Sequence, residues 1–170
     1  PISHVISSFG VHQAQYADDT QLYIELSDEN KLIALNDCFT SVLNWFSING
    51  LALNPSKSEV IIIGTGARIR RKAALPAVIL GGSSIGVSRT VKSLGVTLDE
   101  TLSFNNHVDN VCRASFFNIR ALRHVRRYID EDTARIVAGS VVGARLDYCN
   151  SIFYGTTAFN LARLQRILNA

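Results

Sequence analysis

The sequence predicts an α+β fold, with strands and one long helix in its N-terminal part and helices in its C-terminal part. Apolar and polar residues alternate over residues 11–26, which is the period of a half-buried strand. From about residue 104 the apolar residues recur every three or four positions, as on one face of a helix. Hydrophobic residues form 47% of the 170 residues, enough to bury a core, so disorder is excluded as the main state.

The first predicted element is a β-hairpin over residues 11–26, with Ala-Asp-Asp at residues 17–19 between its strands. Every second residue from Leu22 to Leu26 is apolar, so these side chains would share one face of the second strand. We therefore expect two carboxylates at the tip of the hairpin.

An amphipathic helix is expected next, because apolar residues repeat at helical spacing from Leu32 to Phe46 after a cap in residues 27–29. The β-like runs 51–53 and 58–63 follow, on either side of a proline turn. Further along, a Gly-Gly pair predicts a second hairpin over residues 78–87. Residues 91–98 are then expected to form a single strand.

The first helix of the C-terminal part is predicted to have one apolar and one basic side. Apolar residues from Val108 to Val125 form a stripe, and at about 100° per residue Arg113, Arg120 and Arg127 fall opposite it.

Two more helices are expected beyond it. The second runs from about residue 131 to 146, capped by Asp130, and carries apolar residues between Ile136 and Val141. The third covers residues 158–168.

Charge is distributed unevenly along the chain. Residues 1–66 carry a net charge of −5, residues 67–98 carry +6, and residues 99–170 carry +2, for a total of +3. Basic stretches attract phosphate backbones and clustered acids attract divalent metals.

Three widely spaced cysteines support neither a disulfide framework nor a zinc site. No apolar run approaches the roughly 20 residues of a membrane span. We expect a soluble protein without a membrane partner, in a reducing intracellular compartment, nucleus or cytoplasm.

Two adjacent aspartates on a hairpin tip suit nucleotidyl transfer. That reaction uses divalent metals, held by carboxylates and substrate phosphates, to align a 3′-hydroxyl with an α-phosphate. Paired aspartates also favour turns, so Ala-Asp-Asp alone does not identify a catalytic site.

The residues on either side of Ala-Asp-Asp make the sequence similar to a known family. Tyr16–Asp19 spells Tyr-Ala-Asp-Asp, and the segments Val42–Glu59 and Val91–Asp99 follow it. Together they resemble the reverse transcriptases of non-LTR retrotransposons, closest to the Jockey-like and chicken-repeat-like lineages. The resemblance covers nearly the whole chain. It implies a partial right-hand polymerase palm over residues 1–98, with an antiparallel sheet, and a helical thumb over residues 99–170 that includes Leu-Asp-Tyr-Cys-Asn at residues 146–150.

The resemblance also implies roles for the hairpin residues. Asp18 would bind the catalytic Mg²⁺ or Mn²⁺, and Asp19 would either support that site or only stabilise the turn. Tyr16 and Ala17 would lie beside the primer terminus or the incoming nucleotide, although a tyrosine that ends a strand is also an ordinary sheet residue.

Other implied roles lie outside the hairpin. Lys57 would act on the leaving pyrophosphate, or be an exposed turn lysine. Leu94 and Gly95 match the primer grip, but a glycine within a strand also marks a bulge. Arg113, Arg120 and Arg127 would follow the template–primer phosphates, or form a solvated helix face. We interpret the basic residues 68–72 as solvated.

The implied substrates are an RNA template, a DNA primer and deoxynucleoside triphosphates. The matched motifs do not include the earlier palm strand, which in this family supplies another essential aspartate. They do not include the fingers either. We therefore expect a fragment that is inactive alone. Two alternatives are open: a catalytically silent nucleic-acid-binding remnant, which would bind duplexes without Asp18 or Asp19, and a decayed gene fragment without function.

Overall fold

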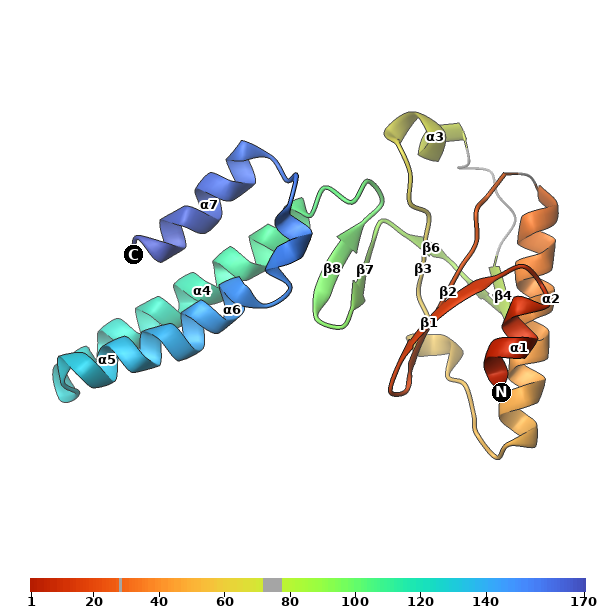
Figure 1. Cartoon of the computed structure of the whole chain (residues 1–170), viewed down its shortest axis with the longest axis horizontal. Helices are drawn as coiled ribbons and strands as arrows, with labels where there is room; N and C mark the ends of the chain where they lie inside the picture. Colours follow the sequence, from red (N-terminus) through yellow and green to blue (C-terminus); the bar gives the residue numbers. More distant parts are fainter. Residues whose placement is uncertain (28, 72–77) are drawn as a thin grey trace. The chain divides into compact units, whose positions relative to one another are not determined.

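The computed structural model describes residues 1–27, 29–71 and 78–170, and its fold is α+β (Figure 1). The chain divides into two compact units. The N-terminal unit contains residues 1–62 and 67–88, and the C-terminal unit contains residues 63–66 and 89–170. The division therefore precedes residue 90, whereas the resemblance implies a palm–thumb boundary after residue 98. None of the described helices is both long and apolar enough to cross a bilayer.

The N-terminal unit is built from two hairpins, a further pair of short strands, two helices packed on each other and one short helix. Its elements in chain order are α1 (Ile2–Ser7), β1 (His12–Tyr16), β2 (Asp19–Tyr23), α2 (Glu29–Ile48), the 3₁₀ turn η1 (Pro55–Lys57), β3 (Val60–Ile61), α3 (Gly66–Arg71), β4 (Val78–Leu80), β5 (Ser83–Ile85) and β6 (Val87–Ser88). The cap predicted for α2 in residues 27–29 includes residue 28, which lies outside the described residues. Residue 72, the last of the basic residues 68–72, also lies outside them.

The core of this unit lies between α1, α2 and the hairpin. Ile6 and Cys38 are fully buried, and the partly buried Leu22 and Ile24 pack against the same cluster. The alternation of the second strand therefore directs its apolar side chains inward as predicted, although β2 ends at Tyr23 rather than at residue 26.

Two strand predictions in this unit are wrong. Residues 51–53 form no strand, and only Val60–Ile61 of the run 58–63 does, pairing in parallel with β6. The hairpin β4–β5 around the Gly-Gly turn is confirmed. Among the described residues the strands form four separate two-stranded sheets rather than one antiparallel sheet, three antiparallel and one parallel.

The C-terminal unit is a hairpin followed by packed helices. Its elements are β7 (Thr90–Ser93), β8 (Val96–Asp99), α4 (Asn105–Val125), the 3₁₀ turn η2 (Arg126–Tyr128), α5 (Glu131–Ala138), the π-helical turn η3 (Gly139–Gly143), α6 (Ala144–Asp147), the 3₁₀ turn η4 (Asn150–Phe153) and α7 (Ala158–Leu168). The prediction of one strand over residues 91–98 is wrong, because the chain reverses at Leu94-Gly95 and β7 pairs with β8.

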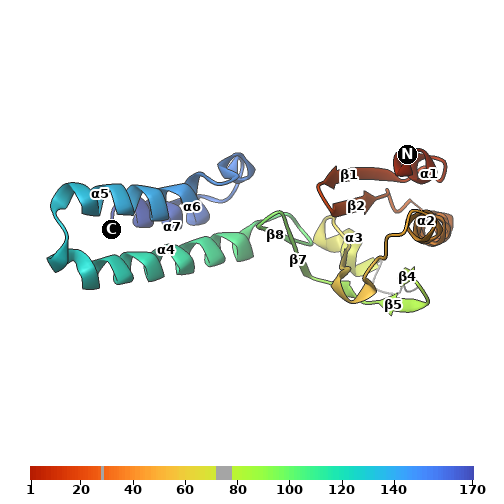
Figure 2. The ribbon, with the colours of Figure 1, turned by 90° about the horizontal axis from the view of Figure 1, so that it is seen from below.

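The helices surround a second core. α4 contacts α7 as well as the segment formed by α5, η3 and α6, and both ribbon views show these helices side by side (Figure 2). Val108 is fully buried in this core, together with Cys112 and Ile167.

The second and third predicted helices of this unit are both present, but the second is interrupted. The third helix has the predicted bounds, residues 158–168. The second begins where Asp130 caps it, with the Asp130 carboxylate accepting from the N–H of Thr133 at 2.7 Å, but a π-helical turn interrupts it. That turn begins at Gly139 and ends at Gly143. Ile136, expected on the apolar side, is 68% exposed.

Candidate catalytic hairpin and basic helices

The β1–β2 hairpin places the Tyr-Ala-Asp-Asp motif at a two-residue turn. Tyr16 pairs with Asp19, so Ala17 and Asp18 alone form the loop. Ala17 has φ 52°, a left-handed conformation that alanine rarely adopts. The side-chain amide of Gln15 donates to the carbonyl oxygen of Ala17 at 3.3 Å, which supports the turn.

The side chains of this turn are open to solvent. Asp18 and Asp19 are exposed, and Tyr16 is 69% exposed. Neither carboxylate forms a hydrogen bond or an ion pair with another described side chain, so both are available to an external ligand. Asp18 lies in the loop, and Asp19 is the first residue of β2.

These two carboxylates supply only part of a metal site. Carboxylate oxygens are suitable ligands for Mg²⁺. Within the described residues, however, no three Asp, Glu, His or Cys side chains are grouped closely enough to hold a metal ion. The pair provides two of the three carboxylates that the resemblance implies, and the described donor set does not fit a two-metal centre by itself.

Lys57 is the last residue of the 3₁₀ turn η1, and its side chain is exposed. In sequence it is well separated from the β1–β2 hairpin. Asn54 holds the turn, because its side-chain oxygen accepts from the N–H of Ser56 at 3.0 Å and from its hydroxyl at 2.7 Å. Beside this turn lies a groove of about 540 Å³. Its lining is rich in hydroxyl groups and comprises Pro55, Ser56, Ser58, Glu59, Ser83, Ser84, Ile85, Gly86 and Ser88, without Lys57.

The Leu94-Gly95 segment is a hairpin turn and not a strand bulge. Leu94 has φ 45° and Gly95 has φ 83°, so both residues are left-handed, as in a type I′ turn. The Tyr148 hydroxyl donates to the carbonyl oxygen of Leu94 at 2.5 Å. A Cβ added at Gly95 would lie 3.3 Å from the Tyr148 ring. The positive φ therefore favours glycine here, and a Cβ would force the Tyr148 ring to shift by a few tenths of an ångström.

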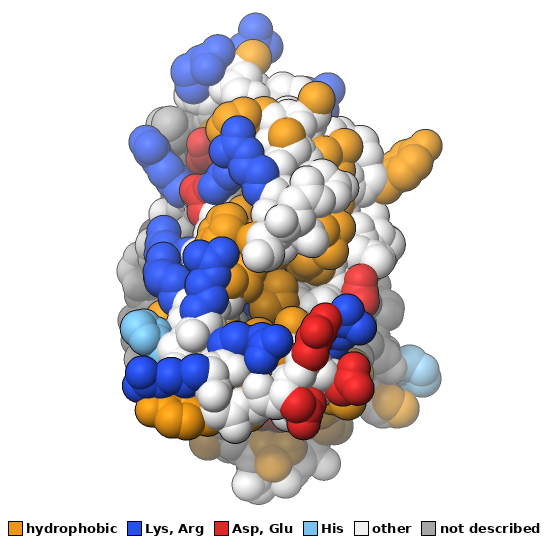
Figure 3. Space-filling view, turned by 90° about the vertical axis from the view of Figure 1, so that its left-hand side faces the viewer, with side chains coloured by type: hydrophobic (Ala, Val, Ile, Leu, Met, Phe, Trp, Pro, Cys, Tyr) orange, Lys and Arg blue, Asp and Glu red, His pale blue; other side chains and the backbone are white. Residues whose placement is uncertain are grey.

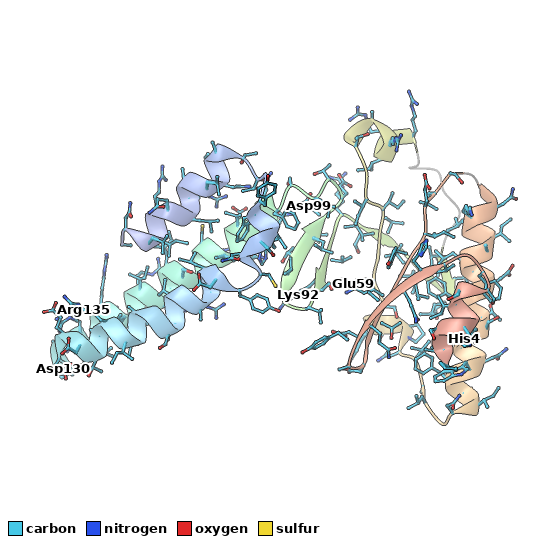
Figure 4. All side chains as sticks on the ribbon, viewed as in Figure 1. His4, Glu59, Lys92, Asp99, Asp130 and Arg135 are labelled. Atoms are coloured by element: carbon cyan, nitrogen blue, oxygen red, sulfur yellow. The ribbon has the colours of Figure 1, made fainter. Side chains whose placement is uncertain are left out.

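Asp99 organises the connection from β8 to α4, a role that the sequence analysis did not predict (Figure 4). Its carboxylate is 7% exposed and accepts five hydrogen bonds from Thr101, Ser103 and Phe104. Burial would raise the pKa of Asp99, but the hydrogen bonds from Ser103 and Thr101 outweigh burial and lower it. The connection includes Leu102 and Phe104, both with positive φ, so Asp99 holds a backbone path that is otherwise unfavourable.

The basic side of α4 is confirmed for two of the three predicted arginines. Arg113 and Arg120 are exposed on α4 and, seven residues apart, share one face. Arg127 does not continue the helix, because α4 ends at Val125 and Arg127 lies in η2, where its guanidinium is 4.7 Å from the centre of the Tyr128 ring. Figure 3 shows Lys and Arg side chains gathered beside exposed hydrophobic ones.

The predicted site residues therefore form three groups. Tyr16, Ala17, Asp18 and Asp19 share one turn of the N-terminal unit, and Lys57 lies in another turn of that unit. The Leu-Gly turn and the arginines belong to the C-terminal unit. Comparisons with protein-family models, curated proteins and solved structures find no match to this chain.

Proposed function

We propose that this chain supplies the catalytic hairpin and the nucleic-acid-binding helices of an RNA-directed DNA polymerase of the non-LTR retrotransposon type. The observation that carries the proposal is the Tyr-Ala-Asp-Asp motif at a two-residue hairpin turn, with Asp18 and Asp19 exposed. Residues 1–98 would belong to the palm of that enzyme and residues 99–170, with the packed helices, to its thumb.

In this proposal the hairpin contributes metal ligands to a shared site. A bound Mg²⁺ or Mn²⁺ would activate the primer 3′-hydroxyl and neutralise charge on the leaving pyrophosphate. The chain's own contribution is to present Asp18, with Asp19 beside it, on a loop closed by Tyr16. The core beneath β2 fixes the base of this hairpin, so the loop is attached to a packed support.

The remaining ligand would come from residues other than those described here, so the chain alone would not polymerise. Lys57 would be available to a triphosphate as an exposed ammonium, and the Leu94-Gly95 turn would contact the primer. The RNA template, the DNA primer and the deoxynucleoside triphosphates are the proposed substrates.

Primer extension on an RNA template tests this proposal, with Mg²⁺ or Mn²⁺ present. The chain is assayed alone and joined to a segment that supplies the fingers and the N-terminal palm of a polymerase of this type. We expect synthesis only from the joined form, and a loss of about 100-fold or more in Asp18→Asn, comparable to removing a group that stabilises transition-state charge. Asp37→Asn, an exposed aspartate on α2, is the matched control and should retain activity.

Two results would contradict the proposal. Synthesis by the joined form that survives Asp18→Asn would refute the assignment of the hairpin. Efficient, Asp18-dependent synthesis by the chain alone would show that no further ligand is needed.

A second candidate function is nucleic-acid binding without catalysis, which the exposed Arg113 and Arg120 on α4 favour. It predicts salt-dependent duplex binding that is unchanged in the double variant Asp18→Ala, Asp19→Ala, together with no synthesis in any form. Synthesis by the joined chain distinguishes the first function from the second.

A further inference from the structure

A groove of about 440 Å³ in the C-terminal unit includes Arg113, and the functions above assign no role to its other lining residues. Residues from α4 and α7 line it, although they are about 50 positions apart in sequence. The lining residues are Asp109, Cys112, Arg113, Phe116, Arg163 and Arg166.

The groove carries more positive than negative charge. Arg163 forms an ion pair with Asp109, which neutralises one arginine and ties α7 to α4. Arg113 and Arg166 are exposed and form no ion pair with another described residue. Two guanidinium groups are thus available to an anion, and guanidinium recognises phosphate by paired hydrogen bonds.

Aromatic side chains accompany these arginines. Phe116 lines the groove and is 36% exposed. Phe159 is 70% exposed, and the Arg163 guanidinium lies 5.5 Å from the centre of its ring. A basic groove with exposed aromatic rings is typical of single-strand binding, because phosphates contact the arginines while unpaired bases stack on the rings. A duplex keeps its bases stacked internally, so it would leave Phe116 unused.

We propose that the α4–α7 groove binds single-stranded nucleic acid, with a backbone phosphate on Arg113 and Arg166 and an unpaired base against Phe116. This inference rests on the proposed function in one respect: a polymerase must hold an unpaired template strand, and the groove would bind such a strand. Arg163, paired with Asp109 and placed against Phe159, would hold α7 against α4 beside this site.

Fluorescence anisotropy with a labelled RNA of about 12 nucleotides tests the site, since single-strand sites span roughly 4–16 nucleotides. We expect Phe116→Leu to weaken binding at least about fivefold. The matched control is Phe117→Leu, whose side chain is 64% exposed but does not line the groove, and its affinity should stay within about twofold of wild type.

The arginines are tested through the salt dependence of binding. The double variant Arg113→Gln, Arg166→Gln should lower the slope of log affinity against log salt by about 1.4, or about 0.7 for each lost phosphate contact with a single strand. Arg135→Gln is the charge-matched control, because Arg135 is exposed and pairs with Glu131 on α5 (Figure 4). It should leave the slope within about 0.3 of wild type.

Cys112 provides a local readout within the groove. It is 7% exposed, and burial raises the pKa of its thiol, so alkylation should be slow but measurable by mass spectrometry. Bound RNA should slow the alkylation of Cys112 severalfold and leave Cys149, which does not line the groove, unchanged.

The outcomes are decisive. Equal affinity of wild type and Phe116→Leu, or unprotected Cys112 in the RNA complex, would each overturn the groove proposal. RNA binding with all expected effects, but no synthesis by the joined chain, would refute only the polymerase function. Synthesis with unaltered RNA affinity in these variants would refute only the groove.

Discussion

Replacing Asp99 with asparagine should destabilise the C-terminal unit through one identifiable hydrogen bond. Oδ1 of Asp99 accepts from both donors of Thr101 and from the N–H of Ser103, and asparagine can retain this oxygen. Oδ2 accepts from the N–H of Phe104 at 2.8 Å and from the hydroxyl of Ser103 at 3.1 Å. An amide NH₂ at that position cannot accept either bond. The hydroxyl can rotate to another partner, but the N–H of Phe104 cannot.

The magnitude follows from these contacts. A hydrogen bond to a charged group contributes about 1.5–3 kcal/mol, and leaving a buried donor unpaired adds to the cost. We therefore expect Asp99→Asn to lower the free energy of unfolding by about 2–3 kcal/mol. For a unit of this size, each kcal/mol shifts Tm by roughly 4–8 °C, so the expected decrease is roughly 10–20 °C. Asp99→Ala, which loses all five bonds, should be less stable still.

Urea unfolding followed by circular dichroism measures this effect, and hydrogen exchange of the α4 amides locates it. Asp147→Asn is the control, because Asp147 is exposed at the end of α6 and its loss should change stability by no more than about 0.5 kcal/mol. If Asp99→Asn proved as stable as Asp147→Asn, the carboxylate would not hold the β8–α4 connection and the argument would fail.

Three further predictions concern the stability of the chain. Tyr148→Phe should lower the free energy of unfolding by about 1 kcal/mol, because the Leu94 carbonyl loses its hydroxyl donor. Hydrogen exchange at residues 93–96 should become faster, and unchanged exchange there would contradict the prediction. In urea unfolding, Gly95→Ala should lower the free energy of unfolding more than Gly82→Ala does. Both positions have a positive φ, but only a Cβ at residue 95 meets Tyr148. Equal decreases would count against this contact. Burial lowers the pKa of His107, so folding disfavours its proton and stability should fall as the pH drops below about 6.5 towards the folded-state pKa. His107→Gln should flatten this part of the stability profile, and an unchanged profile would mean that another group titrates there.

Local patterns in the sequence predicted the elements that depend on local interactions. The alternation before and after Ala-Asp-Asp gave the β1–β2 hairpin, and the helical spacing gave α2, α4 and α7. Asp130 was identified as a helix cap because its partner, the N–H of Thr133, is three residues away. Each of these features is decided by residues within a few positions of one another.

The errors arise where partners are distant or where the backbone departs from its usual conformation. Residues 91–98 alternate without interruption, and nothing in that alternation shows that leucine at residue 94 would adopt a positive φ. The partner that secures this turn, Tyr148, lies 54 residues further along the chain. The parallel pairing of β3 with β6 likewise joins segments that are separate in sequence.

The sequence by itself therefore determined the acidic motif, the strand or helix type of the longer elements and the basic side of α4. Only the tertiary structure decided that Asp18 occupies a two-residue loop, that Asp99 secures the start of α4, and that arginines from α4 and α7 line one groove. The physical reason is that periodicity and capping depend on near neighbours. A turn secured by a distant hydroxyl, or a groove between two helices, depends on which surfaces pack together.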